Sequence, residues 1–189
     1  MSSDCKSILD KLSSWSIEDQ NHVFAAWAAG NAGQLPLRGP TVAVARRWLE
    51  KAGFDSQFSV PSVTGPEGMD RLHRDWRIAF ISAARCDGYG ISHGRASKFI
   101  NVYNKARFLK SELAEQSPYC LLHPPIDRLL ITNIRRELSG SCLREFSRLT
   151  TTPWSQLDSE QYEQLIITLR SWMKGLPFWK LEALWPGAR

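Results

Sequence analysis

The sequence predicts an all-α fold, and two observations carry that prediction. Apolar residues recur at helical spacing along most of the chain. The alternation that marks a strand occurs only around residues 58–63, where Pro61 interrupts it. With 189 residues, 43% of them hydrophobic and 23% charged, the chain suits one compact domain spanning 1–189. The pattern leaves open whether that domain divides into two lobes.

Local signals predict where the helices begin and end. Ser16 and Asp19 have the spacing of a capping box ahead of an alanine-rich helix that ends at Gly30. Pro40 stands where a first-turn proline belongs, and Gly53 closes the helix that follows. We expect helices at 4–14, 17–29, 41–52, 69–86, from His93 to beyond Tyr103, and at 125–138, 141–149, 158–174 and 177–185. Helix 125–138 has the apolar positions Ile126, Leu129, Leu130, Ile134 and Leu138.

The positive charge of the chain is concentrated in one segment. Residues 94–148 contain ten Lys or Arg against five Asp or Glu, an excess equal to the formal charge of +5 for the whole chain. A basic segment of this kind indicates a phosphate-backbone partner such as a nucleic acid. The alternative is an ordinary solvated basic face.

Several classes of site and location are disfavoured by the sequence. The four cysteines lie far apart, without a C-x-x-C pair, and the four histidines lack metal-ligand spacing, so we expect no metal and no cofactor. The N-terminus is polar and has no apolar h-region, and no apolar run is long enough to cross a bilayer. We therefore expect a cytoplasmic protein with reduced thiols and no membrane association, acting as a monomer.

The helix start at 93–101 has features that suit contact with a phosphate. Gly94 permits a close backbone approach, and the amides of a first helical turn carry partial positive charge. Arg95 adds a full charge, and Ser97 keeps the surface open. Lys98 lies one turn after Gly94 and one turn before Asn101, so these three can share a face. The alternative is a helix start that is simply exposed to solvent.

A carboxylate follows a rigid pair of prolines further along the chain. Pro124 and Pro125 fix φ, so the helix is expected to begin abruptly at about Pro125 with Asp127 in its first turn. The helix dipole favours the ionised form of an acid at that place. An acid there commonly only helps to begin the helix. Opposite a basic groove, however, it could stabilise a cationic sugar in a transition state.

Together these two segments resemble the core of the helix-hairpin-helix DNA glycosylase superfamily. Residues 94–101 match a G-x-G-x-K-x-x-N-like hairpin and helix, with Ala96 at the second glycine, and residues 125–128 match the segment that bears the catalytic aspartate. The resemblance implies that Lys98 is the amine nucleophile of members with lyase activity. It implies that Asp127 stabilises the sugar cation or activates the attacking group, and Asn101 could orient the carboxylate or hold a phosphate.

The chain also departs from the common pattern of that superfamily. Residues 90–93 replace the usual L-P-G, and no iron–sulfur cysteines follow. The separation of Lys98 from Asp127 is longer than in common members and closer to the archaeal oxoguanine glycosylase branch. The matching residues cover about a quarter of the chain. They are also similar to a bacterial phage-defence type that removes glucosylated hydroxymethylcytosine from modified phage DNA.

By this resemblance the protein would flip a nucleotide out of the duplex and enclose its base with aromatic side chains. Candidates for the base pocket are Trp27, Trp76, Tyr89, Tyr103 and His123, each of which could instead be a core residue. Candidates for DNA contacts are Gly94, Arg95, Ser97, Lys105 and Arg128. Two rival functions remain, namely a non-catalytic DNA-binding module with the same hairpin and an all-α protein whose basic face binds an acidic partner.

Overall fold

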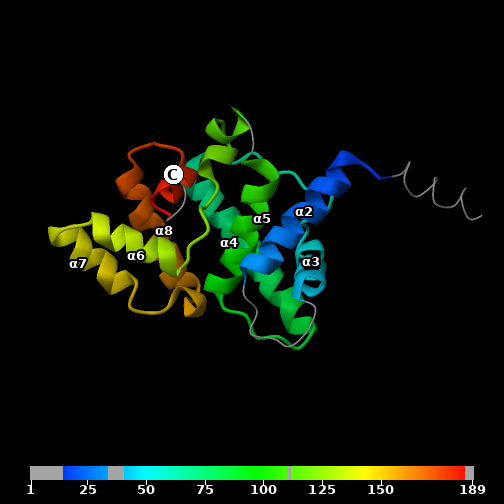
Figure 1. Ribbon diagram of the computed structural model, residues 1–189, viewed down its shortest axis with the longest axis horizontal. Coiled ribbons are helices and arrows are strands. Elements are labelled where there is room, and N and C mark those ends of the chain that lie inside the picture. Colours follow the sequence, from blue (N-terminus) through cyan, green and yellow to red (C-terminus); the bar gives the residue numbers. More distant parts are fainter. Residues whose placement is uncertain (1–14, 34–40, 110–111, 186–189) are drawn as a thin grey trace, which may run out of the picture.

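A computed structural model describes residues 15–33, 41–109 and 112–185, and this part of the chain is all-helical, without a strand (Figure 1). The helix expected at 4–14 lies outside the described residues. The α-helices are α2 (Ile17–Ala32), α3 (Thr41–Lys51), α4 (Gly65–Cys86), α5 (His93–Phe108), α6 (Arg128–Glu137), α7 (Gly140–Leu149) and α8 (Ser159–Met173). Short 3-10 turns are η1 (Glu112–Glu115), η2 (Tyr119–Leu121), η3 (Trp154–Gln156) and η4 (Phe178–Leu184).

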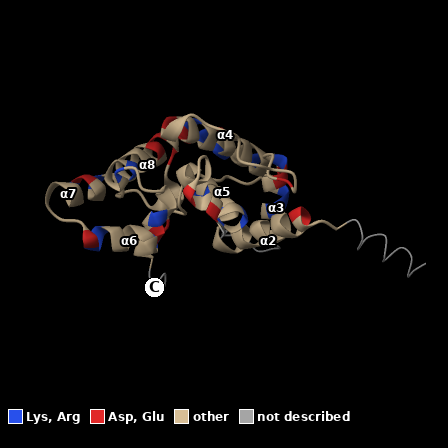
Figure 2. Cartoon of the chain, turned by 90° about the horizontal axis from the view of Figure 1, so that it is seen from above, with Lys and Arg blue, Asp and Glu red and all other residues tan. Residues whose placement is uncertain are grey.

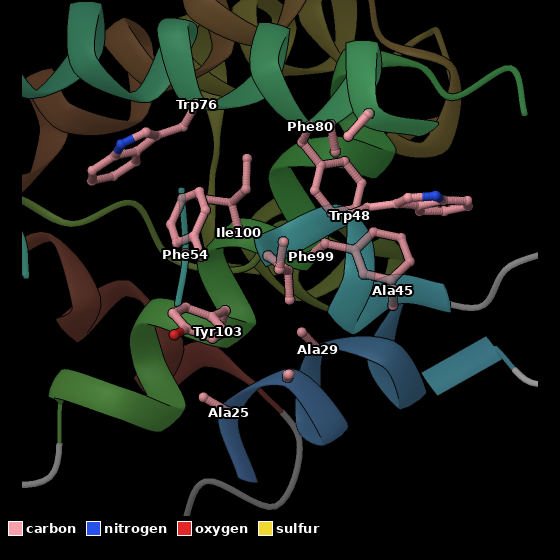
Figure 3. Close-up of a cluster of buried hydrophobic side chains, with 14 of the residues drawn as sticks. Ala25, Ala29, Ala45, Trp48, Phe54, Trp76, Phe80, Phe99, Ile100 and Tyr103 are labelled. Atoms are coloured by element: carbon pink, nitrogen blue, oxygen red, sulfur yellow. The ribbon is translucent and has the colours of Figure 1, made fainter. Parts of the chain in front are cut away.

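The buried apolar residues form two clusters. The first fills the space between α2, α3, α4 and α5 and includes the fully buried rings of Trp48, Phe54, Phe80 and Phe99 (Figure 3). The second joins α6, α7, α8 and η4 and is built around side chains such as Leu165. Figure 1 shows α6, α7 and α8 on one side of α4 and α5, with α2 and α3 on the other. Residues that connect α4, α5 and α8 therefore lie between the two clusters.

The first cluster depends on a close contact between α2 and α3. The capping box of Ser16 and Asp19 begins α2 as expected, with both reciprocal hydrogen bonds present. The prediction that Gly30 ends this helix is wrong, because α2 continues to Ala32. A Cβ atom on Gly30 would lie 3.0 Å from Cα of Val42, so the glycine allows the two backbones to approach instead of terminating the helix.

The boundaries of α3 and α4 follow the local signals in part. Gly53, two residues after the end of α3, has a φ of +91°, which agrees with a glycine closing that helix. Helix α4 begins at Gly65, four residues before the predicted start, because Pro66 occupies its first turn. At its other end, α4 stops at Cys86 as predicted, and α5 begins at His93 as predicted.

Helix α6 begins later than the sequence predicts. It starts at Arg128, with Asp127 as the extended N-cap residue, because a side chain that caps the helix satisfies its first amides more effectively than two prolines can. Leu129, expected on the apolar stripe, is 53% exposed. The segment predicted as a last helix at 177–185 forms the 3-10 turn η4 instead.

None of the helices in the described ranges is long and apolar enough to cross a membrane. The same ranges contain no group of three or more His, Cys, Asp or Glu side chains that could hold a metal ion. Cys86, Cys120 and Cys142 are not in disulfides.

Candidate active site

The structure brings Lys98 and Asp127 together. Lys98 Nζ lies 2.8 Å from Asp127 Oδ2, although 29 residues separate the two in sequence. Lys98 comes from the second turn of α5, and Asp127 is the N-cap residue of α6. The side chain of Lys98 is 5% exposed and that of Asp127 is 18% exposed. A buried ammonium is thus paired with a carboxylate that still reaches the surface.

Both oxygen atoms of the Asp127 carboxylate accept hydrogen bonds. Oδ1 accepts from the amide of Leu130 at 2.9 Å and from Nε1 of Trp185 at 3.1 Å, and Oδ2 accepts from Lys98. Burial by itself would raise the pKa of this carboxyl, but the Leu130 amide, the Lys98 ammonium and the Trp185 indole outweigh it. The pKa of Asp127 therefore lies below its ordinary value, and the group is a carboxylate at neutral pH.

Two tryptophans that the sequence did not single out enclose the ammonium. Lys98 Nζ lies 5.0 Å from the ring centroid of Trp185 and 5.9 Å from that of Trp154. Indole faces attract cations at such distances, more strongly when the cation is withdrawn from water. The chain contains eight tryptophans, an unusual number, and this was the sequence signal that could have indicated tryptophans at the site. It could not identify these two, because they follow Lys98 by many residues and reach it only through the tertiary fold.

The close approach expected at Gly94 is present, but another segment of the protein makes it. The Gly94 amide donates to the Leu157 carbonyl at 3.0 Å, and a Cβ on Gly94 would lie 1.8 Å from the Trp154 carbonyl oxygen. Ser92 caps the same turn by accepting from the Arg95 amide, and its hydroxyl donates to the Ser155 carbonyl. The segment containing η3 therefore covers the start of α5 where the sequence suggested a phosphate.

The remaining predicted DNA contacts are in different environments. Ser97 is 1% exposed and donates to the Gly94 carbonyl at 2.8 Å, so it is an internal residue. Lys105 forms an ion pair with Glu182, and its Nζ lies 4.9 Å from the Trp185 ring centroid. Arg95 is half-buried at the start of α5. Arg128 is exposed in the first turn of α6 and is the member of this set that faces solvent most fully.

Part of the basic excess is used inside the protein, and part reaches the surface. Figure 2 shows both signs of charge on α4 and α6, whereas α5 contains Lys and Arg but no Asp or Glu. Arg107 donates to backbone carbonyls of residues 55 and 56, and Arg135 donates to Thr150. Four arginines of α6 and α7 are exposed, namely Arg128, Arg136, Arg144 and Arg148. The exposed arginines of residues 94–148 therefore lie on these two helices.

Asn101 holds the segment before Asp127. Its amide nitrogen donates to the Pro124 carbonyl at 3.0 Å and to the Tyr162 hydroxyl at 3.1 Å, and its carbonyl oxygen lies 2.7 Å from Nε2 of His73. Asn101 is 1% exposed. It therefore fixes the backbone three residues before Asp127 and does not contact the carboxylate directly, so its expected part in orienting Asp127 is indirect.

His123 extends this network toward the surface. Its ring is stacked on His73 with centroids 4.1 Å apart, Nδ1 lies 3.1 Å from the Tyr162 hydroxyl, and Nε2 lies 2.8 Å from Oδ1 of Asp70. Arg170 also donates to Asp70. These last two residues line a cavity of about 700 Å³ between α4 and α8. A continuous set of hydrogen bonds thus connects that cavity to the segment carrying Asp127.

The other four predicted base-pocket residues do not gather at the pair. Trp76 and Tyr103 are buried in the first cluster, where each packs against Phe54. Tyr89 packs against Trp48, with ring centroids 5.1 Å apart. Trp27 is 54% exposed on α2. The aromatic surroundings of the Lys98–Asp127 pair come from Trp154 and Trp185 instead.

Comparison with known proteins found no match to a family model, to a curated protein or to a solved structure. The chemistry open to the site follows from the residues that form it. They provide a fixed carboxylate beside an amine in a largely dry environment, next to a surface with exposed arginines. Such an arrangement can stabilise a developing positive charge on a substrate and, after loss of a proton from the amine, supply a nucleophile.

Proposed function

We propose that this protein is a DNA glycosylase that excises a modified base and leaves an abasic site. The observation that carries the proposal is the 2.8 Å contact between Lys98 Nζ and Asp127 Oδ2, two residues first paired by their resemblance to the helix-hairpin-helix glycosylases. Glucosylated hydroxymethylcytosine in phage DNA is the substrate suggested by the closer resemblance. In that case the protein would serve antiviral defence in the cytoplasm.

The proposed mechanism uses Asp127 as a fixed negative charge. Cleavage of the N-glycosidic bond leaves positive charge on the deoxyribose, and a carboxylate held ionised beside C1′ stabilises that charge. The lowered pKa of Asp127 keeps it in the required state at neutral pH. The departing base takes the bonding electron pair and then a proton. C1′ bonds to the oxygen of water, which gives up that proton, or to the nitrogen of Lys98 after the ammonium has released it.

DNA binding is assigned to the exposed arginines of α6 and α7. Arg128 adjoins Asp127 in sequence, so a strand held there passes the carboxylate. Charge reversal of Arg128 and Arg144 together is expected to lower the slope of log affinity against log salt by about 0.9 for each phosphate that the protein no longer neutralises. This change would affect all DNA sequences alike, since phosphate contacts position a strand without reading it.

The test is a base-release assay on plain DNA and on DNA with oxidised, alkylated or glucosylated-hydroxymethyl bases, with abasic sites scored by alkaline cleavage. Asp127→Asn is expected to abolish release while leaving DNA binding within a few-fold. Asp158→Asn is the matched control, because Asp158 caps α8 as Asp127 caps α6 but lies outside the pair. Loss of release in both variants would show a folding defect. Trapping with borohydride would test Lys98 as the nucleophile, and Lys98→Ala should remove any adduct.

A second candidate is a non-catalytic DNA-binding module. It is favoured by the occupancy of both carboxylate oxygens of Asp127, one of them by the helix cap that any structural aspartate could make. Under this alternative no substrate yields abasic sites, and salt-sensitive binding survives Asp127→Asn. The same assay therefore separates the two functions.

A further inference from the structure

Trp185 contacts both members of the Lys98–Asp127 pair. Its Nε1 donates to Asp127 Oδ1 at 3.1 Å, while its ring centroid lies 5.0 Å from Lys98 Nζ. A second cation, Lys105, lies 4.9 Å from the same ring. A single indole therefore shields the ammonium with its ring and orients the carboxylate with its N–H group.

The backbone that carries Trp185 is anchored independently of the pair. The Trp185 amide donates to the Glu182 carbonyl at 2.9 Å, and the Leu184 carbonyl accepts from Asn133 of α6 at 2.7 Å. Glu182 itself pairs with Lys105. Because these contacts hold the main chain, the part that can leave the pair at least cost is the indole side chain.

The partners of Asp127 differ in how easily they can be replaced. The Leu130 amide belongs to the first turn of α6, and losing it would begin to unfold that helix. Lys98 is buried, and separating its charge from the carboxylate would be costly. The Trp185 hydrogen bond is the remaining contact of this carboxylate, and it is made by a half-buried side chain.

We propose that Trp185 is a displaceable cover and a positioning residue for the Lys98–Asp127 pair, and that a substrate reaches the carboxylate by displacing the indole. This inference rests on the proposed function in naming DNA as the displacing partner. The cover itself is a property of the protein alone. A covered resting state lowers the apparent affinity for substrate by the fraction of molecules that are open.

The first test measures the accessibility of Lys98 without any substrate. Lysines are acetylated with N-hydroxysuccinimidyl acetate, and the rate at Lys98 is followed by peptide mass spectrometry relative to the exposed Lys174. Trp185→Ala is expected to raise the Lys98 rate at least tenfold, whereas Trp185→Phe, which keeps a ring, should change it less than twofold. The matched control is Trp179→Ala, because Trp179 lies in η4, which Trp185 directly follows, but its indole donates to the Ala114 carbonyl. An unchanged rate of Lys98 acetylation in Trp185→Ala would overturn the proposal that Trp185 covers the pair.

The second test needs only folded wild-type protein and Trp185→Phe. The difference between their fluorescence signals isolates Trp185, and its quenching by acrylamide is measured with and without duplex DNA containing a tetrahydrofuran abasic analogue. Displacement predicts a quenching constant at least twofold higher on DNA binding. A constant that stays the same or falls, with DNA bound, would overturn displacement by DNA.

Failure of this inference and failure of the proposed function give different results. If Trp185 is a cover but the protein is not a glycosylase, Trp185→Ala still exposes Lys98 and no substrate yields abasic sites. If the protein is a glycosylase without such a cover, base release depends on Asp127 while Lys98 acetylation is the same in wild type and Trp185→Ala.

Discussion

The buried ammonium of Lys98 depends on the carboxylate of Asp127 to balance its charge more than that carboxylate depends on the ammonium. Asp127 keeps 18% of its side-chain surface exposed and has two further hydrogen-bond donors, whereas Lys98 is 5% exposed and forms its ion pair with Asp127. A buried charge that loses its counter-charge is far more costly than a partly solvated one. Removing Asp127 should therefore cost more stability than removing Lys98.

This asymmetry predicts a particular double-mutant cycle. Asp127→Asn keeps a side chain able to cap α6 but leaves a buried ammonium without a carboxylate, and we expect it to lower the free energy of unfolding by about 3 kcal/mol. Lys98→Met leaves a carboxylate that Leu130, Trp185 and water still solvate, and we expect a loss of about 1 kcal/mol. Urea denaturation of the double variant should show a smaller loss than the sum. Additive losses would contradict the coupling.

Gly94 gives a second prediction, which concerns packing instead of charge. Gly94→Ala would place a Cβ 1.8 Å from the Trp154 carbonyl oxygen, so the backbone of either α5 or η3 must shift. We expect a loss of about 2–3 kcal/mol in the free energy of unfolding. Gly90→Ala is the matched control, because a Cβ there meets nothing within 4 Å. Equal effects of the two substitutions would show that contact with η3 is not the reason for a glycine at 94.

The helix boundaries show what local sequence could and could not predict. The Ser16–Asp19 box and the turn at Gly53 depend on residues a few positions apart, so the sequence predicted both. Gly30 carried the same local signal as a terminating glycine. Its role was decided instead by the approach of Val42 from another helix, which local sequence does not contain.

The candidate site also combines features that the sequence could predict with features that only the tertiary fold determines. The resemblance to a family placed Lys98 and Asp127 in one active site, which composition alone would not have suggested, but it did not predict their direct contact. Trp154 and Trp185 were missed because no spacing rule connects them to Lys98. For Gly94 the sequence correctly indicated a close backbone approach, but the approaching group is a carbonyl of the protein's own chain. Sequence pattern identifies residues with special requirements more readily than it identifies their partners.

A third prediction concerns Glu163 of α8, which connects α8 to α4. It accepts from the wholly buried Arg77 at 2.9 Å and also from the exposed Arg74. Burial opposes ionisation, but hydrogen bonds from Arg74, Ser159 and Arg77 lower the pKa of Glu163 to about 2. Glu163→Gln leaves the Arg77 guanidinium without a counter-charge and is expected to cost about 2–4 kcal/mol in urea denaturation. Arg74→Met should lower the free energy of unfolding only slightly. A larger loss from Arg74→Met than from Glu163→Gln would contradict the view that the buried Arg77 is the partner that depends most on Glu163.

The pH dependence of stability follows from the stacked rings of His73 and His123. Both rings are buried, which holds the pKa of each well below the ordinary value of 6.5, and the guanidinium of Arg77 acts in the same direction on both. In the unfolded chain each ring would titrate near 6.5. Between that value and the lowered folded value the unfolded state binds more protons, so stability is complete above about pH 7 and falls as the pH decreases below 6.5.

Between pH 7.5 and pH 5.5 we expect the free energy of unfolding to fall by about 1.4 kcal/mol for each histidine that stays neutral in the folded protein. Burial raises the pKa of Asp70 and of Glu182, which act in the opposite direction, and lowers that of His93, which acts in the same direction as the two rings. We expect a net loss of stability on acidification. His123→Gln, which can still bond to Asp70 and Tyr162, should remove about one contribution from the pH dependence while leaving the protein folded. Urea midpoints at the two pH values measure this directly. Equal urea midpoints for the wild-type protein at the two pH values would mean that the folded and unfolded states bind the same number of protons. The two rings would then accept protons in the folded protein, which would contradict their lowered pKa values.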